Sequence, residues 1–141
     1  MEKQLNKLLA DFVVEYHKLQ HFHWYVKGSD FFTVHAKLEE YYDEINEAID
    51  EVAEIMLMNK MKPASTMKEF LKLSSIAEPK GAFTSSATVF KAVLADYKHL
   101  LDEVKAVKAA ADKANNYLVS AKMDDYIGMF SKAIWMLGQT A

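Results

Sequence analysis

Apolar residues recur along this chain at intervals of three and four positions, and no stretch alternates between apolar and polar residues. This spacing places them on one face of an α-helix and predicts an all-α protein. Breaks near the prolines and glycines delimit four long helices, at about 4–26, 29–59, 87–113 and 116–137. The segment "TMKEFLKL" predicts a short extra helix between the second and third long helices. Four long helices with short connections favour a four-helix bundle, and we expect residues 1–141 to form a single domain.

Composition narrows the chemistry that is open to this bundle. The chain contains no cysteine, so disulfides and thiolate metal sites are excluded, and any bound metal must use His, Asp or Glu. Its net charge is −3 and all 17 basic residues are lysines. Because bidentate recognition of phosphate and guanine relies on arginine, specific nucleic-acid recognition is not expected. No apolar run is long enough to span a membrane and the first residues do not resemble a secretion signal, so we expect a cytoplasmic protein.

Three of the five histidines lie within the segment "YHKLQHFHWYVKG", residues 16–28. On a helical wheel His17 and His21 lie at about 120° and 160° from the centre of the apolar stripe, so we expect both to face solvent. His23 lies at the centre of that stripe and must have a polar partner, either as a satisfied core histidine or as a metal ligand. The stripe consists of Leu5, Leu8, Leu9, Phe12, Val13, Tyr16 and Leu19.

Four polar residues of the second helix share one arc of its surface, beside the apolar stripe. This polar arc consists of His35, Glu39, Asp50 and Glu54, at roughly 0°, 40°, 60° and 100°. His35 and Asp50 are roughly 22 Å apart along the helix axis, whereas metal–ligand bonds measure about 2.0–2.2 Å. A single chain therefore cannot bring all four residues to one metal ion.

A second copy of the helix can complete such a site. If two copies cross antiparallel about a two-fold axis between Glu44 and Ile45, His35 lies opposite the partner's Glu54 and, in the same register, Glu39 opposite the partner's Asp50. The pattern predicts two equivalent His/carboxylate sites per dimer. The other interpretation is that the acids only form part of a charged face.

The usual di-iron motif of four-helix bundles gives no support for a site within one chain. Such bundles carry Glu-x-x-His on two helices, and this sequence has no Glu-x-x-His. The nearest approach is Asp96-Tyr97-Lys98-His99, which has no second copy. An internal di-iron site is therefore disfavoured.

The segment "HFHWYVKGSDFFTVH", followed by "DEVAE", resembles the Dps family, the miniferritins. "KPASTMKEFL" resembles the family's short connecting helix, and "KAIWMLGQ" its C-terminal end. The resemblance implies a ferritin-like four-helix subunit that assembles into a hollow homododecamer. It also implies an iron-storing ferroxidase that oxidises Fe(II), preferably with hydrogen peroxide, and stores the ferric product, and so serves iron homeostasis and protects against oxidative stress.

The same resemblance assigns site residues. The ligands would be His23, His35 and Glu39 of one subunit with Asp50 and Glu54 of its two-fold partner, holding two iron ions per site, for which zinc or manganese can substitute. Glu39 stands where the family usually has aspartate, so we expect altered spacing. Trp24 would lie beside the site, either to intercept radicals or to pack as an interface aromatic.

Two other functions stay open at this level. Family members that bind DNA carry a Lys/Arg-rich tail, and only "MEKQ" precedes the first helix here, so tail-mediated DNA binding is not expected. The alternative to a ferroxidase is a cage that binds metal or coats DNA with weak or no ferroxidase activity. A further alternative is a plain dimeric bundle in which the polar arc of the second helix is only interface polarity.

Overall fold

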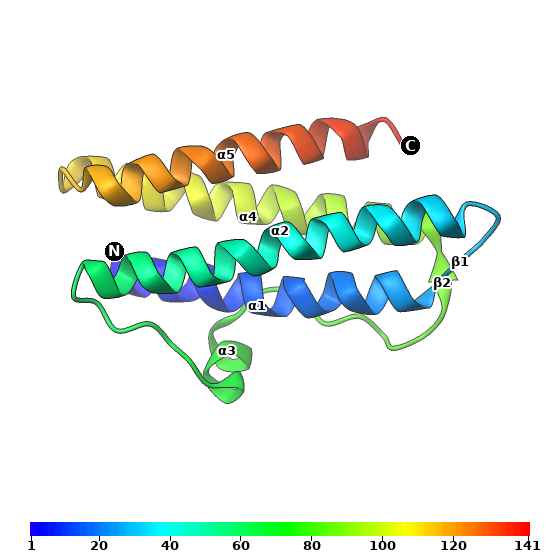
Figure 1. Cartoon of the computed structure of the whole chain (residues 1–141), viewed down its shortest axis with the longest axis horizontal. Helices are drawn as coiled ribbons and strands as arrows, with labels where there is room; N and C mark the ends of the chain where they lie inside the picture. Colours follow the sequence, from blue (N-terminus) through cyan, green and yellow to red (C-terminus); the bar gives the residue numbers. More distant parts are fainter.

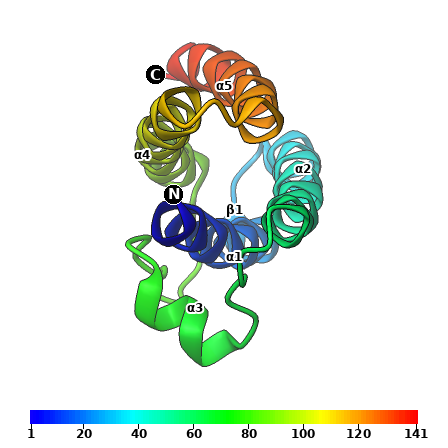
Figure 2. The ribbon, with the colours of Figure 1, turned by 90° about the vertical axis from the view of Figure 1, so that its left-hand side faces the viewer.

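The computed structural model describes residues 1–141 and contains four long helices that run along the long axis of the molecule (Figure 1). They are α1 (Glu2–Tyr25), α2 (Phe31–Met58), α4 (Ser86–Lys113) and α5 (Tyr117–Gly138). Viewed from one end they surround a common core, and α5 lies across the bundle from α1 (Figure 2). The four-helix bundle predicted from the sequence is confirmed, with helix ends close to the expected positions.

The apolar stripes of α1 and α2 face this core, as their spacing predicted. Phe12 of α1 is fully buried and contacts Tyr126 and Phe130 of α5, with ring centroids 5.7 and 6.0 Å apart. Tyr97 of α4 completes the aromatic cluster, edge-on to Phe130 at 5.0 Å. Aromatic side chains bury a large apolar area, so this cluster links the two halves of the bundle.

The predicted short helix is also present, as α3 (Met67–Leu73), and it packs outside the bundle against α1 (Figure 2). Its N-terminus is a capping box. The Thr66 hydroxyl accepts a hydrogen bond from the Glu69 backbone N–H and donates one to the Glu69 carboxylate, at 3.2 and 2.8 Å. The cap explains why so short a segment is helical at this point.

Two short strands were not expected from the sequence. β1 (Val26–Lys27) pairs in parallel with β2 (Thr84–Ser85), with Val26 opposite Thr84. Strands of two residues are too short to produce an alternating apolar and polar pattern, so the sequence carries no signal for them. The pairing joins the end of α1 to the start of α4. None of the helices combines the length and the apolar character needed to cross a bilayer.

The expectation that His21 faces solvent is wrong, whereas His17 is exposed as predicted. His21 is buried, and its ring stacks on Tyr25 with centroids 4.6 Å apart. The connection before β2 covers this side of α1, because Phe83 packs on Tyr25 at 4.7 Å. A helical wheel treats the polar side of α1 as open to solvent and cannot anticipate a covering loop.

A buried carboxyl group lies in the seam between α1 and α4. Glu15 is fully buried, and neither carboxylate oxygen has a hydrogen-bond partner. Its neighbour Asp96 is paired with Lys18, at 2.8 Å. Burial, and next the negative charge of Asp96, raise the pKa of the Glu15 carboxyl well above its usual range. Folding therefore favours the neutral, protonated form of the Glu15 carboxyl.

Replacing Glu15 by glutamine is expected to remove a pH dependence of stability. The folded protein holds the Glu15 proton to a higher pH than the unfolded chain, whose glutamate pKa is about 4.3. The contribution of this proton to stability is complete below about pH 4.3 and is lost as the pH rises toward the folded-state pKa. Between pH 5 and 8 the wild type should lose free energy of unfolding relative to Glu15→Gln in guanidinium titrations. The exposed Glu78→Gln should track the wild type, and a Glu15→Gln curve parallel to the wild type would contradict the assignment.

Candidate metal centre

The end of α1 and the start of α2 bring His23 and His35 face to face. Their rings are stacked, with centroids 3.6 Å apart and planes inclined by 12°. Each Nδ1 lies within hydrogen-bond distance of the other residue's backbone carbonyl, 2.7 Å from His23 to the His35 oxygen and 2.8 Å in the reverse direction. The two side chains therefore hold each other in place across the turn between the helices.

This pairing sets the tautomer of both rings. A carbonyl oxygen can only accept a hydrogen bond, so each Nδ1 carries the proton and donates it. In a neutral imidazole the Nε2 atom then keeps its lone pair, which is the form that binds metal ions. His23 is thus a satisfied core histidine through Nδ1 and also a potential ligand through Nε2. The two interpretations left open by the sequence are compatible.

Glu39 places a carboxylate beside these nitrogen atoms. One turn into α2 from His35, its Oε1 lies 3.9 Å from His23 Nε2, and two metal bonds of about 2.0–2.2 Å span this distance. The Tyr42 hydroxyl donates a hydrogen bond of 3.3 Å to the same oxygen. Burial, and next the charge of Glu39 and the hydrogen bond to it, raise the pKa of Tyr42, which therefore stays a donor.

Tyr42 was not among the residues expected from the sequence. It lies three positions after Glu39 on the same helix, a spacing at which side chains meet, and its ring packs edge-on to His23 at 5.3 Å. Trp24, which was expected beside the site, is 54% exposed, and its ring contacts that of His17 at 5.9 Å. Tyr42 therefore contacts both His23 and Glu39 from within the subunit.

Asp50 and Glu54 are not brought to this group within one subunit. Both are exposed on α2, and Asp50 lies roughly 16 Å along the helix axis from Glu39. Neither carboxylate takes part in a hydrogen bond or an ion pair. Within one chain the structure therefore pairs the two imidazoles and places one carboxylate near His23 Nε2, which is an incomplete ligand set for a metal ion.

Comparison with known proteins places this geometry in a family. Residues 2–141 match the ferritin-like domain. The chain is 41% identical to DNA protection during starvation protein 2 of Bacillus anthracis over 133 residues, which cover 94% of this chain and 90% of that protein.

Solved structures give the same result. A Dps protein from Bacillus brevis superimposes with a TM-score of 0.95 at 35% identity, covering 99% of this chain and 93% of that one. A Dps protein from Vibrio cholerae O1, described as a member of a broad superfamily of ferritin-like diiron-carboxylate proteins, has a TM-score of 0.94 at 30% identity, covering 98% and 86%. The chain therefore belongs to the ferritin-like proteins and, within them, to the Dps family.

Proposed function

We propose that this protein is an iron-storing miniferritin that oxidises Fe(II) with hydrogen peroxide at sites shared by two subunits and stores the ferric product in a hollow dodecamer. The observation that carries the proposal is the His23–His35 pair, whose Nδ1 atoms are engaged by backbone carbonyls so that both Nε2 atoms are available to a metal, with Glu39 3.9 Å from His23 Nε2. Asp50 and Glu54 of the two-fold partner would complete the ligand set. The expected assembly mass is that of twelve subunits of 16.1 kDa.

The ligand types suit the reaction. Carboxylates are hard ligands that favour Fe(III), while neutral imidazoles accept Fe(II) readily. With two Fe(II) ions bound as substrates, each gives one electron to a single peroxide molecule, the O–O bond breaks, and two protons are taken up to form two water molecules. Reduction of peroxide by two electrons at one site avoids release of the hydroxyl radical that a one-electron step produces.

Exposed apolar side chains on α2 support the two-fold arrangement. Phe32 and Leu57 are 85% and 60% exposed within one subunit, so both side chains are available for contact with another subunit. They lie on the side of α2 that carries the polar arc of His35, Glu39, Asp50 and Glu54, called the α2 arc from here on. The axis between Glu44 and Ile45 that pairs the ligands would also place Phe32 opposite the partner's Leu57. A contact that buries both at the ends of the paired helices would hold the ligand sets in register.

Trp24 keeps both of its interpretations in this proposal. It directly follows His23, and with just over half of its side chain exposed it can pack against a partner subunit or lie close enough to the iron ions to intercept radicals. A Trp24→Phe variant separates the two roles. If Trp24 only packs, phenylalanine should preserve the packing and leave iron oxidation unchanged. If Trp24 intercepts radicals, its loss should lead to oxidative damage of the protein during turnover.

The Asp50→Asn variant tests the proposal. We expect iron oxidation by peroxide to fall at least tenfold, on the order of what loss of supporting residues alone costs metal sites. Stopped-flow absorbance of the ferric product measures the rate, and a peroxide assay should give about two iron ions oxidised per peroxide in the wild type. Asp102→Asn, which removes an exposed acid of α4, is the control. An unchanged rate in Asp50→Asn would refute the assigned site.

A DNA-coating cage is the second candidate, since curated relatives are named DNA protection during starvation proteins. The chain's net charge of −3 and its lack of arginine favour only weak, salt-sensitive contacts with DNA. Gel-shift assays at low and physiological salt distinguish the two functions. Tight binding that survives physiological salt, together with no acceleration of iron oxidation, would support coating over ferroxidation.

A further inference from the structure

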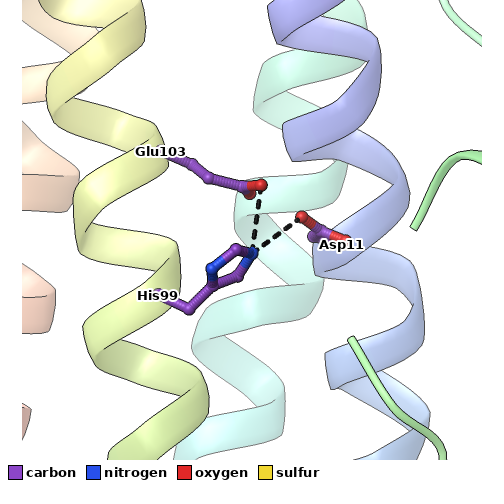
Figure 3. A group of neighbouring side chains, drawn as sticks. All are labelled: Asp11, His99 and Glu103. Carbon is purple, nitrogen blue, oxygen red and sulfur yellow. Dashed lines mark ion pairs between the residues drawn. The ribbon is translucent and has the colours of Figure 1, made fainter. Parts of the chain in front are cut away.

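A second group of potential metal ligands lies in the seam between α1 and α4, away from the α2 arc. Asp11 of α1 and His99 and Glu103 of α4 point toward one another (Figure 3). Their nearest ligand atoms all lie within 4.8 Å of one another. His99 Nε2 is 3.2 Å from Glu103 Oε1 and 3.7 Å from Asp11 Oδ2. Both separations fit two ligands of one ion, whose bonds of about 2.0–2.2 Å span up to about 4.2 Å.

Asp11 is held rigidly in this group. Its side chain is completely buried, and its Oδ1 atom accepts hydrogen bonds from the Ser74 hydroxyl at 2.7 Å and the Ser75 backbone N–H at 2.6 Å. The Ser75 hydroxyl lies 3.2 Å from Asp11 Oδ2 and 2.7 Å from His99 Nε2. The connection that follows α3 therefore closes over the group and adds an oxygen atom to it.

A cation already occupies the centre of the group. The ammonium of Lys7 contacts Asp11 at 3.0 Å, Ser75 at 2.7 Å and the Glu103 carboxylate. When both carboxylates are ionised, the single ammonium of Lys7 cannot balance both of their charges. Glu103 Oε2 is buried and has no hydrogen-bond partner. The Lys7 side chain is 41% exposed, so it can swing outward when another cation enters.

We propose that Asp11, His99 and Glu103 form a second metal site, which takes a divalent transition metal such as zinc or manganese and from which Lys7 is displaced on binding. Two carboxylates and one imidazole are a ligand set suited to these ions, and a divalent cation balances both carboxylate charges, which lysine does not. The bound ion would fasten the Ser74–Ser75 segment to α1 and α4. The site lies within one subunit and is independent of the ferroxidase proposal.

The competing interpretation is an ion-pair cluster that Lys7 alone completes. The two differ in what Lys7 does, because a structural cluster needs the ammonium whereas a metal site competes with it. Replacing Lys7 by methionine keeps most of the side-chain length and removes the charge. It should therefore strengthen metal binding if the site is a metal site.

Zinc titration calorimetry on the full-length protein tests the proposal, in a background that carries Asp50→Asn and Glu54→Gln to remove the two acids that the two-fold partner would supply to the other site. The titration is run at pH 7.5, because burial, and next the neighbouring Asp11, raise the pKa of Glu103 to about 7. We expect His99→Ala or Glu103→Gln to remove one Zn²⁺ per subunit. The exposed, neighbouring Asp102→Asn should retain it, and Lys7→Met should bind about tenfold more tightly.

A Co²⁺ spectrum provides the second measurement. Visible absorption of Co²⁺ bound at this site should be lost in His99→Ala and retained in Asp102→Asn, with circular dichroism and assembly mass confirming that both variants are folded. Asp11 is left unchanged because its loss would release the Ser74–Ser75 segment. If the His99→Ala and Glu103→Gln variants each bind as many Zn²⁺ ions per subunit as the parent protein, the proposal is overturned. Zinc affinity that is unchanged or lower in Lys7→Met would overturn it as well.

Discussion

Subunits with His23→Ala and His35→Ala, and subunits with Asp50→Asn and Glu54→Gln, are each expected to lack iron oxidation alone and to regain it when assembled together. In a mixed dimer, one site takes its histidines and its acids from the altered positions of the two subunits and is doubly defective. The other site takes an intact histidine pair from one subunit and intact acids from its partner. Random mixing makes half of the dimers mixed, so roughly a quarter of the sites, and of the wild-type rate, should return. A site within one subunit would regain nothing.

The experiment requires that subunits of the two variants mix before they assemble. The two variants are denatured together and refolded, and mass spectrometry of differently tagged subunits verifies that mixed assemblies form. Mixing the two assembled proteins without denaturation is the control and should give no activity. Verified mixed assemblies without activity would exclude a site shared about the two-fold axis, while leaving the seam site of α1 and α4 unaffected.

Replacing Phe12 by alanine is expected to lower the free energy of unfolding by about 3–5 kcal/mol. Phe12 is fully buried and reaches across the bundle to Tyr126 and Phe130, so its loss leaves a cavity that surrounding helices cannot fill without moving. Guanidinium denaturation followed by circular dichroism measures the change, and an unchanged m-value shows that the same surface is exposed on unfolding.

Gln4→Ala is the matched control for this loss, because Gln4 lies on the same helix but is exposed. It should change stability by no more than about 0.5 kcal/mol. A Phe12→Ala loss as small as that of the control would mean that α1 does not pack on α5 through this ring. Because the substitution is far from the α2 arc, iron oxidation measured well below the unfolding transition should stay close to wild type.

Much of the fold could be predicted because local periodicity determines it. The spacing of Leu5, Leu8 and Phe12, and the corresponding stripe on α2, marks a buried helical face whatever lies opposite, since a helix repeats every 3.6 residues. The α2 arc could be found for the same reason. Its members belong to one helix, and a two-fold axis relates positions along that helix by arithmetic alone.

The tertiary structure decided what depends on contacts between elements distant in sequence. His21 is buried because the connection before β2 folds over α1, and no property of α1 encodes that cover. The tautomers of His23 and His35 follow from two backbone carbonyls that meet only when the turn is formed.

The seam between α1 and α4 is the clearest case. The sequence alone drew attention to His99 only as an incomplete motif, whereas the fold brings it to Asp11 and Glu103, with Lys7 in their midst. Side-chain periodicity states which face of a helix is buried but not which residues of another helix it meets. The sequence by itself therefore determined the helices, their apolar faces and the α2 arc, and only the packing of helix on helix decided which polar groups share a site.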